Sequence, residues 1–135
     1  MATILVVEDD FDTRDLLARL LEREGYDALS AANGWEALLV LDNHNVDLVL
    51  LDVMMPGMDG VTFLKILRNA QRKMSTPVII VTAMSTEDLA MRTRGLDVQE
   101  VLPKTQKLFD ELIESVHRVL KDRHPVQTEY DGGHS

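Results

Sequence analysis

The chain has 135 residues and is 45% hydrophobic, which is enough for one domain of ordinary size with its own core. Because it contains no cysteine, a disulfide framework and a thiolate metal site are both excluded. Its 23 acidic residues outnumber its 14 basic ones, and the net charge of −9 disfavours non-specific binding to nucleic acid and anionic lipid. Such a charge suits cations or a partner with a basic face.

Targeting and membrane segments are not indicated by the sequence. The apolar stretch ILVV near Met1 is too short for a signal peptide and leads directly into acidic residues. No apolar run approaches the roughly 18 residues of a membrane span. We therefore expect a cytoplasmic protein that does not bind membranes.

The predicted elements alternate between strand and helix. Short runs rich in valine, isoleucine and leucine predict strands, and the strongest three lack the polar alternation of a strand with one wet face. Apolar residues at helical spacing predict the helices between them. In chain order we expect a strand at 3–7, a helix at 12–24, a strand at 26–31, a helix after Asn33, a strand at 46–51, a helix after Asp59, a strand at 77–82, a helix after Ser85, a strand at 100–102 and a helix after Thr105. This order predicts an α/β fold, a doubly wound parallel sheet of five strands with helices on both faces.

Local signals set the expected ends of these elements. Asn33, Asp59, Ser85 and Thr105 have side chains suited to N-caps. Trp35 is expected to be a half-buried packing residue at the start of the second helix. From about residue 122 the chain is polar and without periodicity, so we expect one domain over 1–121 and a disordered tail or linker stub over 122–135.

Acidic residues follow two of the predicted strands. The apolar run VDLVLLD ends in Asp52, where a charge is costly to bury, and Glu8 and Asp9 follow the first strand. In open α/β sheets, ligands bind outside the carboxyl ends of the strands, so these acids are expected to meet there. Clustered carboxylates need a cation between them, and a set of oxygen ligands alone favours a hard ion such as Mg²⁺.

A hydroxyl and an ammonium group follow the next two strands. Thr82 and Lys104 make little sense as metal ligands, but they are suitable donors to a phosphoryl group. That combination leaves Asp52 as a carboxylate that is assisted by a metal, faces a lysine and is placed to attack phosphorus.

Over roughly residues 2 to 121 the sequence resembles the receiver domains of two-component response regulators. The motifs that carry the resemblance are the acid pair after the first strand, LLDVMMPGMDG at 50–60, VTA at 81–83 and the lysine after the last strand. The resemblance implies a flavodoxin-like fold with strand order 2-1-3-4-5. By position, it implies Asp52 as phosphoacceptor, Thr82 as switch hydroxyl, Lys104 as phosphoryl contact, and Glu8, Asp9, Asp52 and the backbone carbonyl of Met54 as Mg²⁺ ligands.

The resemblance also implies how the domain is used. It implies a signalling switch rather than an enzyme, which takes a phosphoryl group from a histidine kinase or a histidine phosphotransfer protein and then alters a downstream protein partner. Its own chemistry is then limited to self-phosphorylation and slow self-dephosphorylation. Direct binding of nucleic acid by this chain is not expected, and homodimerisation on phosphorylation is left open.

Three other functions remain alternatives at this point. The chain is a degenerate receiver that acts only as a binding or dimerisation module, or it is the amino-terminal part of a longer DNA-binding regulator, or it is an aspartyl-phosphate phosphohydrolase. Such hydrolases commonly carry a second aspartate two residues after the nucleophile as general acid and base. Met54 stands at that position, which argues against efficient turnover.

Some residues near the motifs are also expected to shape the site or depart from the family pattern. Pro56 and Gly57 shape the loop beside Asp52, and Gly60 lets the next helix begin close to it. The family usually has an aromatic residue where Val101 stands and a proline where Thr105 stands, and its usual glycine position is occupied by Asp97.

Met54 and Met84 border the approach of a hydrolytic water to a phosphorylated Asp52, so we expect a long-lived phosphorylated state.

Overall fold

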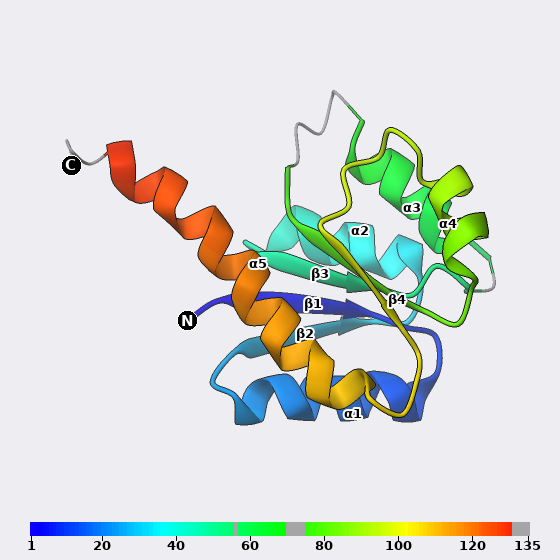
Figure 1. Cartoon of the computed structure of the whole chain (residues 1–135), viewed down its shortest axis with the longest axis horizontal. Helices are drawn as coiled ribbons and strands as arrows, with labels where there is room; N and C mark the ends of the chain where they lie inside the picture. The colour runs from blue at the N-terminus through cyan, green and yellow to red at the C-terminus, as the bar shows by residue number, and fades with distance from the viewer. Residues whose placement is uncertain (56, 70–74, 131–135) are drawn as a thin grey trace.

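The structure, a computed structural model, describes residues 1–55, 57–69 and 75–130, and of residues 123–130 it describes the backbone alone. Five parallel strands form one sheet in the order β2-β1-β3-β4-β5, which confirms the expected topology (Figure 1). The elements are β1 Thr3–Val7, α1 Phe11–Arg23, β2 Asp27–Ala31, α2 Gly34–Asn43, β3 Leu48–Leu51, α3 Gly60–Leu67, β4 Val78–Thr82, α4 Thr86–Arg92, β5 Glu100–Pro103 and α5 Leu108–Tyr130.

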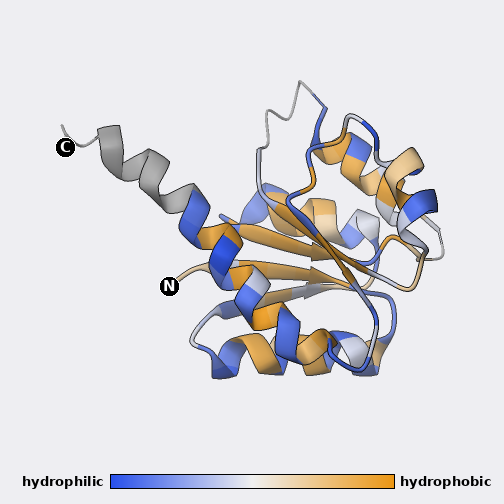
Figure 2. Cartoon of the chain, in the orientation of Figure 1, coloured by the Kyte–Doolittle hydropathy of each residue, from blue (hydrophilic) through white to orange (hydrophobic). Residues whose placement is uncertain are grey.

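The sheet is covered by helices on both faces. Figure 1 shows α1 and α5 on one side of the strands and α2, α3 and α4 on the other. Successive side chains of a strand point to opposite faces, so Ile4 of β1 packs in the cluster with α1 and α5 while Leu5 packs in the cluster with α2 and α3. Burial on both faces explains why β1, β3 and β4 are hydrophobic almost throughout (Figure 2).

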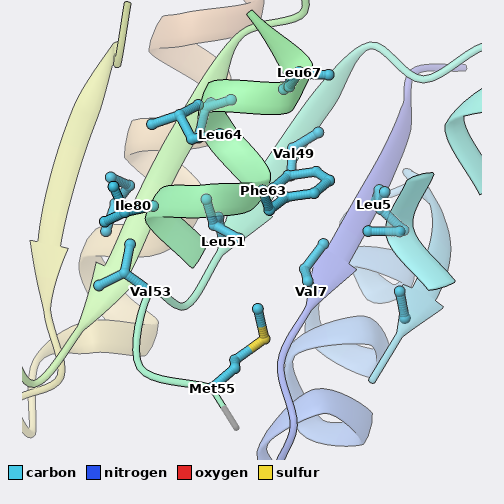
Figure 3. Close-up of a cluster of buried hydrophobic side chains, with 14 of the residues drawn as sticks. Leu5, Val7, Val49, Leu51, Val53, Met55, Phe63, Leu64, Leu67 and Ile80 are labelled. Carbon is cyan, nitrogen blue, oxygen red and sulfur yellow. The ribbon is translucent and has the colours of Figure 1, made fainter. Parts of the chain in front are cut away.

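The larger of the two clusters centres on α3. Phe63 and Leu64 point from this helix toward the sheet, where Phe63 lies beside Val49 and Leu51 of β3 (Figure 3). All four side chains are fully buried. Burying large apolar side chains of this kind contributes about 1.5–3 kcal/mol each, so this packing fixes α3, and the loop before it, on the sheet.

The N-caps expected at Asn33, Asp59 and Ser85 are confirmed. Each side chain accepts a hydrogen bond from the backbone N–H three residues on, and Asp10 caps α1 in the same way. The expectation that Thr105 caps the last helix is wrong. Its hydroxyl accepts from the N–H of Lys107 at 3.2 Å, which makes a turn ahead of the helix, and α5 begins only at Leu108.

Two other local expectations differ from the structure. Trp35 is 65% exposed rather than half-buried, because the buried stripe of α2 is formed by Gly34, Ala37, Leu38 and Leu41 and Trp35 lies off that stripe. The last helix continues to Tyr130, beyond the boundary expected after residue 121, so residues 122–130 are helical rather than without secondary structure. Hydrogen bonds of a formed helix can extend past the end of its apolar stripe, which periodicity does not detect. The division into a domain and a tail stays a prediction.

Within the described part of the chain, no helix has the length and apolar character that crossing a membrane requires.

Candidate functional site

The acidic residues are positioned by the pairing of the two central strands. Val7 of β1 is in register with Leu51 of β3, so the residues that follow, Glu8 and Asp52, leave the sheet side by side. The backbone holds this arrangement, because the N–H of Asp52 donates to the carbonyl of Val7 at 3.0 Å. The carboxyl ends of β1 and β3 therefore form one site.

Three carboxylates gather at this edge of the sheet. One carboxylate oxygen from each of Glu8, Asp9 and Asp52 lies within 4.8 Å of the other two. Glu8 and Asp52 are 2% and 5% exposed, whereas Asp9 faces solvent. Magnesium prefers oxygen ligands at about 2.1 Å in an octahedron, whose opposite ligands are about 4.2 Å apart. Neighbouring ligands of the same octahedron are about 3.0 Å apart, so the three carboxylates could share one such ion after moving together by at most about 2 Å.

Lys104 lies among the buried acids. Its Nζ donates to Glu8 Oε1 at 2.8 Å and to Asp52 Oδ2 at 3.1 Å. Burial of the ammonium lowers the pKa of Lys104, but the hydrogen bonds and charges of Glu8 and Asp52 outweigh this effect, and the pKa is raised overall. Lys104 is therefore a fixed positive charge next to both carboxylates.

The remaining oxygens of the buried acids have backbone partners. Asp52 Oδ1 accepts from the N–H of Met54 at 3.0 Å, and Glu8 Oε2 accepts from the N–H of Asp10 at 3.2 Å. Each buried carboxylate thus bonds Lys104 through one oxygen and the backbone through the other. These contacts explain how two charges are tolerated inside the fold.

Burial and the neighbouring glutamate act together on Asp9. Its pKa is raised, first by partial burial and then by a hydrogen bond to Glu8 and the charge of Glu8. A cation that binds at this cluster would relieve the part of this shift that comes from the charge of Glu8.

Gly60 brings the start of α3 against the site. A Cβ at Gly60 would lie 2.4 Å from Val53 Cα and 2.7 Å from the carbonyl oxygen of Asp52, so only glycine fits without a backbone shift. The N–H of Gly60 donates to the carbonyl of Val53 at 3.1 Å. The expected close start of this helix is confirmed. Gly57 has a φ of 79°, a conformation that favours glycine, and Pro56 lies outside the described residues.

Thr82 lies at the carboxyl end of the next strand. It is 1% exposed, and its hydroxyl accepts from the N–H of Met84 at 3.1 Å. Its carbonyl accepts from the N–H of Lys104 at 3.0 Å, which ties the ends of β4 and β5 together. The structure thus brings Glu8, Asp9, Asp52 and Lys104 into direct proximity and places Thr82 beside them through the backbone.

The departures from the family pattern lie on the side of α4 and β5. Val101 is 38% exposed on β5 and lines a groove of about 410 Å³ between α4 and β5, together with residues such as Leu89 and Ala90. The peptide bond between Lys104 and Thr105 is trans, since no cis bond occurs in the part of the chain that the structure describes. Asp97 accepts hydrogen bonds from Arg68 through its backbone carbonyl.

Two contacts of the site were missed by reasoning from sequence. The resemblance gave Lys104 a phosphoryl group as partner, and its pairing with Glu8 was not expected. Arg14 was not considered at all, although its Nη1 donates to the carbonyl of Glu8 at 2.8 Å. No sequence signal distinguishes this arginine from the other basic residues of α1.

Comparison with known proteins agrees with the geometry. Residues 4–117 match the response regulator receiver domain. The chain is 39% identical over 126 residues to the transcriptional regulatory protein CpxR of Escherichia coli K12, covering 92% of this chain and 51% of CpxR. It is 35% identical over 125 residues to sporulation initiation phosphotransferase F of Bacillus subtilis, covering 93% of this chain and 95% of that protein.

Solved structures give the same result. Chemotaxis protein CheY4 of Vibrio cholerae matches with a TM-score of 0.81 at 28% identity, covering 88% of this chain and 98% of CheY4. Response regulator TrrA of Thermotoga maritima, solved in complex with Mg²⁺ and BeF, matches with a TM-score of 0.76 at 36% identity, covering 87% of this chain and 98% of TrrA. The chain belongs to the receiver domains of response regulators, the phosphorylatable switches of two-component signalling. It spans about half the length of the CpxR proteins that it matches.

Proposed function

We propose that Asp52 accepts a phosphoryl group from a histidine kinase or a histidine phosphotransfer protein, and that the phosphorylated domain alters a downstream protein partner. The observation that carries this proposal is the meeting of Glu8, Asp9 and Asp52 beside Lys104. Those three acids are the one cluster with metal-ligand spacing in the described part of the chain. The cytoplasmic location expected from the sequence belongs to this proposal.

Mg²⁺ is the proposed cofactor, held by Glu8, Asp9, Asp52 and the backbone carbonyl of Met54. The side-chain donors are carboxylate oxygens alone, which suits this ion. When bound, Mg²⁺ would neutralise negative charge on the phosphoryl group and on the acids around it.

The protein's own residues have distinct roles in the transfer. An oxygen of Asp52 attacks phosphorus as its bond to the donor breaks, so the donor leaves with the bonding electrons. Lys104, already within hydrogen-bond distance of Asp52, supplies a positive charge for the transferred oxygens. The Thr82 hydroxyl accepts from the N–H of Met84, so its own proton remains free to be donated to a phosphoryl oxygen.

The test is phosphorylation by acetyl phosphate, with the intact mass as readout. Wild type with Mg²⁺ should gain one phosphoryl group, and wild type in EDTA should not. Asp52→Asn should show no gain, whereas Asp59→Asn should behave as wild type. Asp59 is the matched control because it lies in the same motif, and asparagine preserves its role as the N-cap of α3. An equal gain in Asp52→Asn would contradict the assignment.

A second candidate is the receiver part of a longer transcriptional regulator. It is favoured by the match to CpxR, of which this chain covers 51%, while the match that covers 95% of sporulation initiation phosphotransferase F favours a single-domain protein. The mass of the protein purified from its native cells separates the two. A mass well above 15.2 kDa supports the longer regulator, and a mass near that value supports the single domain.

A further inference from the structure

Arg14 is bound to the backbone of the acid pair. Its Nη1 lies 2.8 Å from the carbonyl oxygen of Glu8 and 3.4 Å from that of Asp9. Arg14 belongs to the beginning of α1, which is capped by Asp10, so the helix and the acid pair are joined both along the chain and through this side chain. The guanidinium thus contacts the carbonyls of two of the three residues whose carboxylates form the acidic cluster.

An exposed aromatic ring covers the same guanidinium. Phe11 is 65% exposed, and Arg14 Cζ lies 5.4 Å from the centre of its ring. A guanidinium over an aromatic face is attracted by the electrons of the ring, which restrains the arginine in this position. This contact gives a role to an aromatic side chain that buries little surface in the core.

The other restraints on the segment that carries Glu8 and Asp9 act on Glu8 rather than on Asp9, since Glu8 is 2% exposed and its Oε1 accepts from Lys104 Nζ at 2.8 Å. The N–H of Glu8 donates to the carbonyl of Ala31 at 3.1 Å, and Glu8 Oε2 accepts from the N–H of Asp10. Asp9 faces solvent, so packing does little to fix it. Groups that hold the ligands of a metal from behind commonly change its affinity by about 10–100-fold when they are removed.

We infer that Arg14 is a positioning residue, which orients Glu8 and Asp9 for a divalent cation without touching the cation itself. This inference rests on the proposed function, because the cation is the proposed Mg²⁺. The direction of the change in Mg²⁺ affinity distinguishes this role from a simple effect of charge. A positive charge near the site repels a cation, so an arginine that acted only through its charge would weaken Mg²⁺ binding, and its removal would tighten that binding. Removal of a positioning residue would instead weaken Mg²⁺ binding.

The experiment is a titration of the whole chain with Mg²⁺, followed by calorimetry or amide chemical shifts. We expect Arg14→Met to bind Mg²⁺ about tenfold more weakly than wild type. Arg14→Lys should recover part of the affinity, because an ammonium can still donate to the carbonyl of Glu8. The matched control is Arg19→Met on the same helix, where the arginine pairs with Asp15 on the surface at 2.9 Å, and it should bind as wild type.

Unchanged or tighter binding in Arg14→Met would overturn the role of Arg14. The melting temperature of each variant in EDTA shows whether it is folded, and affinity is compared among folded variants. If Arg14→Met does not fold, Phe11→Ala takes its place, since it releases the guanidinium without removing it. Weaker Mg²⁺ binding in Phe11→Ala supports the role, and unchanged binding contradicts it. A wild type that does not bind Mg²⁺ would overturn the proposed function together with this role.

Discussion

Lys104 Nζ lies 2.8 Å from Glu8 Oε1, although 96 positions of the chain separate the two residues. The same nitrogen lies 3.1 Å from Asp52 Oδ2. One ammonium group therefore offsets part of the charge of the two buried carboxylates that are also proposed ligands of Mg²⁺. Lys104 and the proposed Mg²⁺ would therefore act on the same carboxylates, so the loss of Lys104 should make stability depend on Mg²⁺.

Lys104→Met should destabilise the protein in EDTA and make it depend on Mg²⁺. Removing one partner of a fully buried ion pair costs about 3–5 kcal/mol, and because the Lys104 side chain is 27% exposed we expect a loss of about 1–3 kcal/mol in the free energy of unfolding. Mg²⁺ should restore more stability to this variant than it adds to wild type. Urea unfolding in EDTA and in Mg²⁺ measures both, with Lys107→Met as an exposed control. Equal stabilisation by Mg²⁺ in Lys104→Met and wild type would show that lysine and metal do not share the carboxylates.

Gly60→Ala should cost more stability than Gly57→Ala. The new Cβ at Gly60 would meet Val53 Cα at 2.4 Å, and a backbone clash of this kind is expected to cost about 3 kcal/mol. At Gly57 the φ of 79° is strained for alanine, but apart from its chain neighbours no described atom lies within 4 Å of the added Cβ, so the cost should be about 1–2 kcal/mol. Gly60→Ala should also slow phosphorylation, because the carbonyl of Asp52 must move. Similar losses of stability in the two variants would contradict the steric explanation.

Glu100 should contribute to the pH dependence of stability. Hydrogen bonds from Arg118, with a smaller effect of Ser115, lower the pKa of Glu100 against the opposing effect of burial. A lowered folded pKa stabilises the protein above the unfolded value, ordinarily 4.5, and this stabilisation is lost as the pH falls through the folded pKa.

The measurement is urea unfolding of wild type and Glu100→Gln over a series of pH values that begins above 4.5, the ordinary pKa of a glutamate, and falls below it. Wild type should be the more stable at the upper end, and the difference should shrink as the pH falls. Glu111→Gln is an exposed control on α5 and should follow wild type. A difference that stays constant with pH would mean that the charge of Glu100 does not stabilise the fold.

Met54→Asn should shorten the lifetime of phosphorylated Asp52. Met54 is 55% exposed, and its N–H bonds Asp52, which places its backbone beside the phosphorylation site; its thioether cannot activate a water as a general base. Met84 is partly buried and packs against the larger core cluster, so Met84→Glu combines a polar group with lost packing. Decay of the phosphorylated protein in Mg²⁺, after removal of acetyl phosphate, should be faster in Met54→Asn. If both variants decay at the wild-type rate, shielding by methionine is wrong.

Much of the fold could be predicted because its signals are local. A continuous apolar run indicates a strand that is covered on both faces, and Asn33, Asp59 and Ser85 identify helix starts by their own hydrogen bonds. The approximate place of the site also followed from sequence, since parallel strands of this sheet all end at one edge. Glu8 and Asp52 therefore had to be neighbours once β1 and β3 were adjacent.

The contacts that could not be predicted depend on where a long side chain turns in three dimensions. Lys104 reaches across to Glu8, and Arg14 bends back to a carbonyl six residues earlier; neither contact has a pattern in the sequence. Trp35 was misjudged because its size suggested packing, whereas its position on α2 places it outside the buried stripe. Thr105 has the right chemistry for a cap, but it bonds the residue two positions on instead of starting the helix.

The position of Lys104 after β5 links the site to the completion of the sheet. β5 lies at an edge of the sheet and pairs with β4, the strand made just before it. During synthesis Glu8, Asp9 and Asp52 are made before Lys104, so a chain that ends before β5 carries the three acids without the ammonium that pairs with Glu8 and Asp52. Such a chain lacks the cation proposed to receive the phosphoryl oxygens.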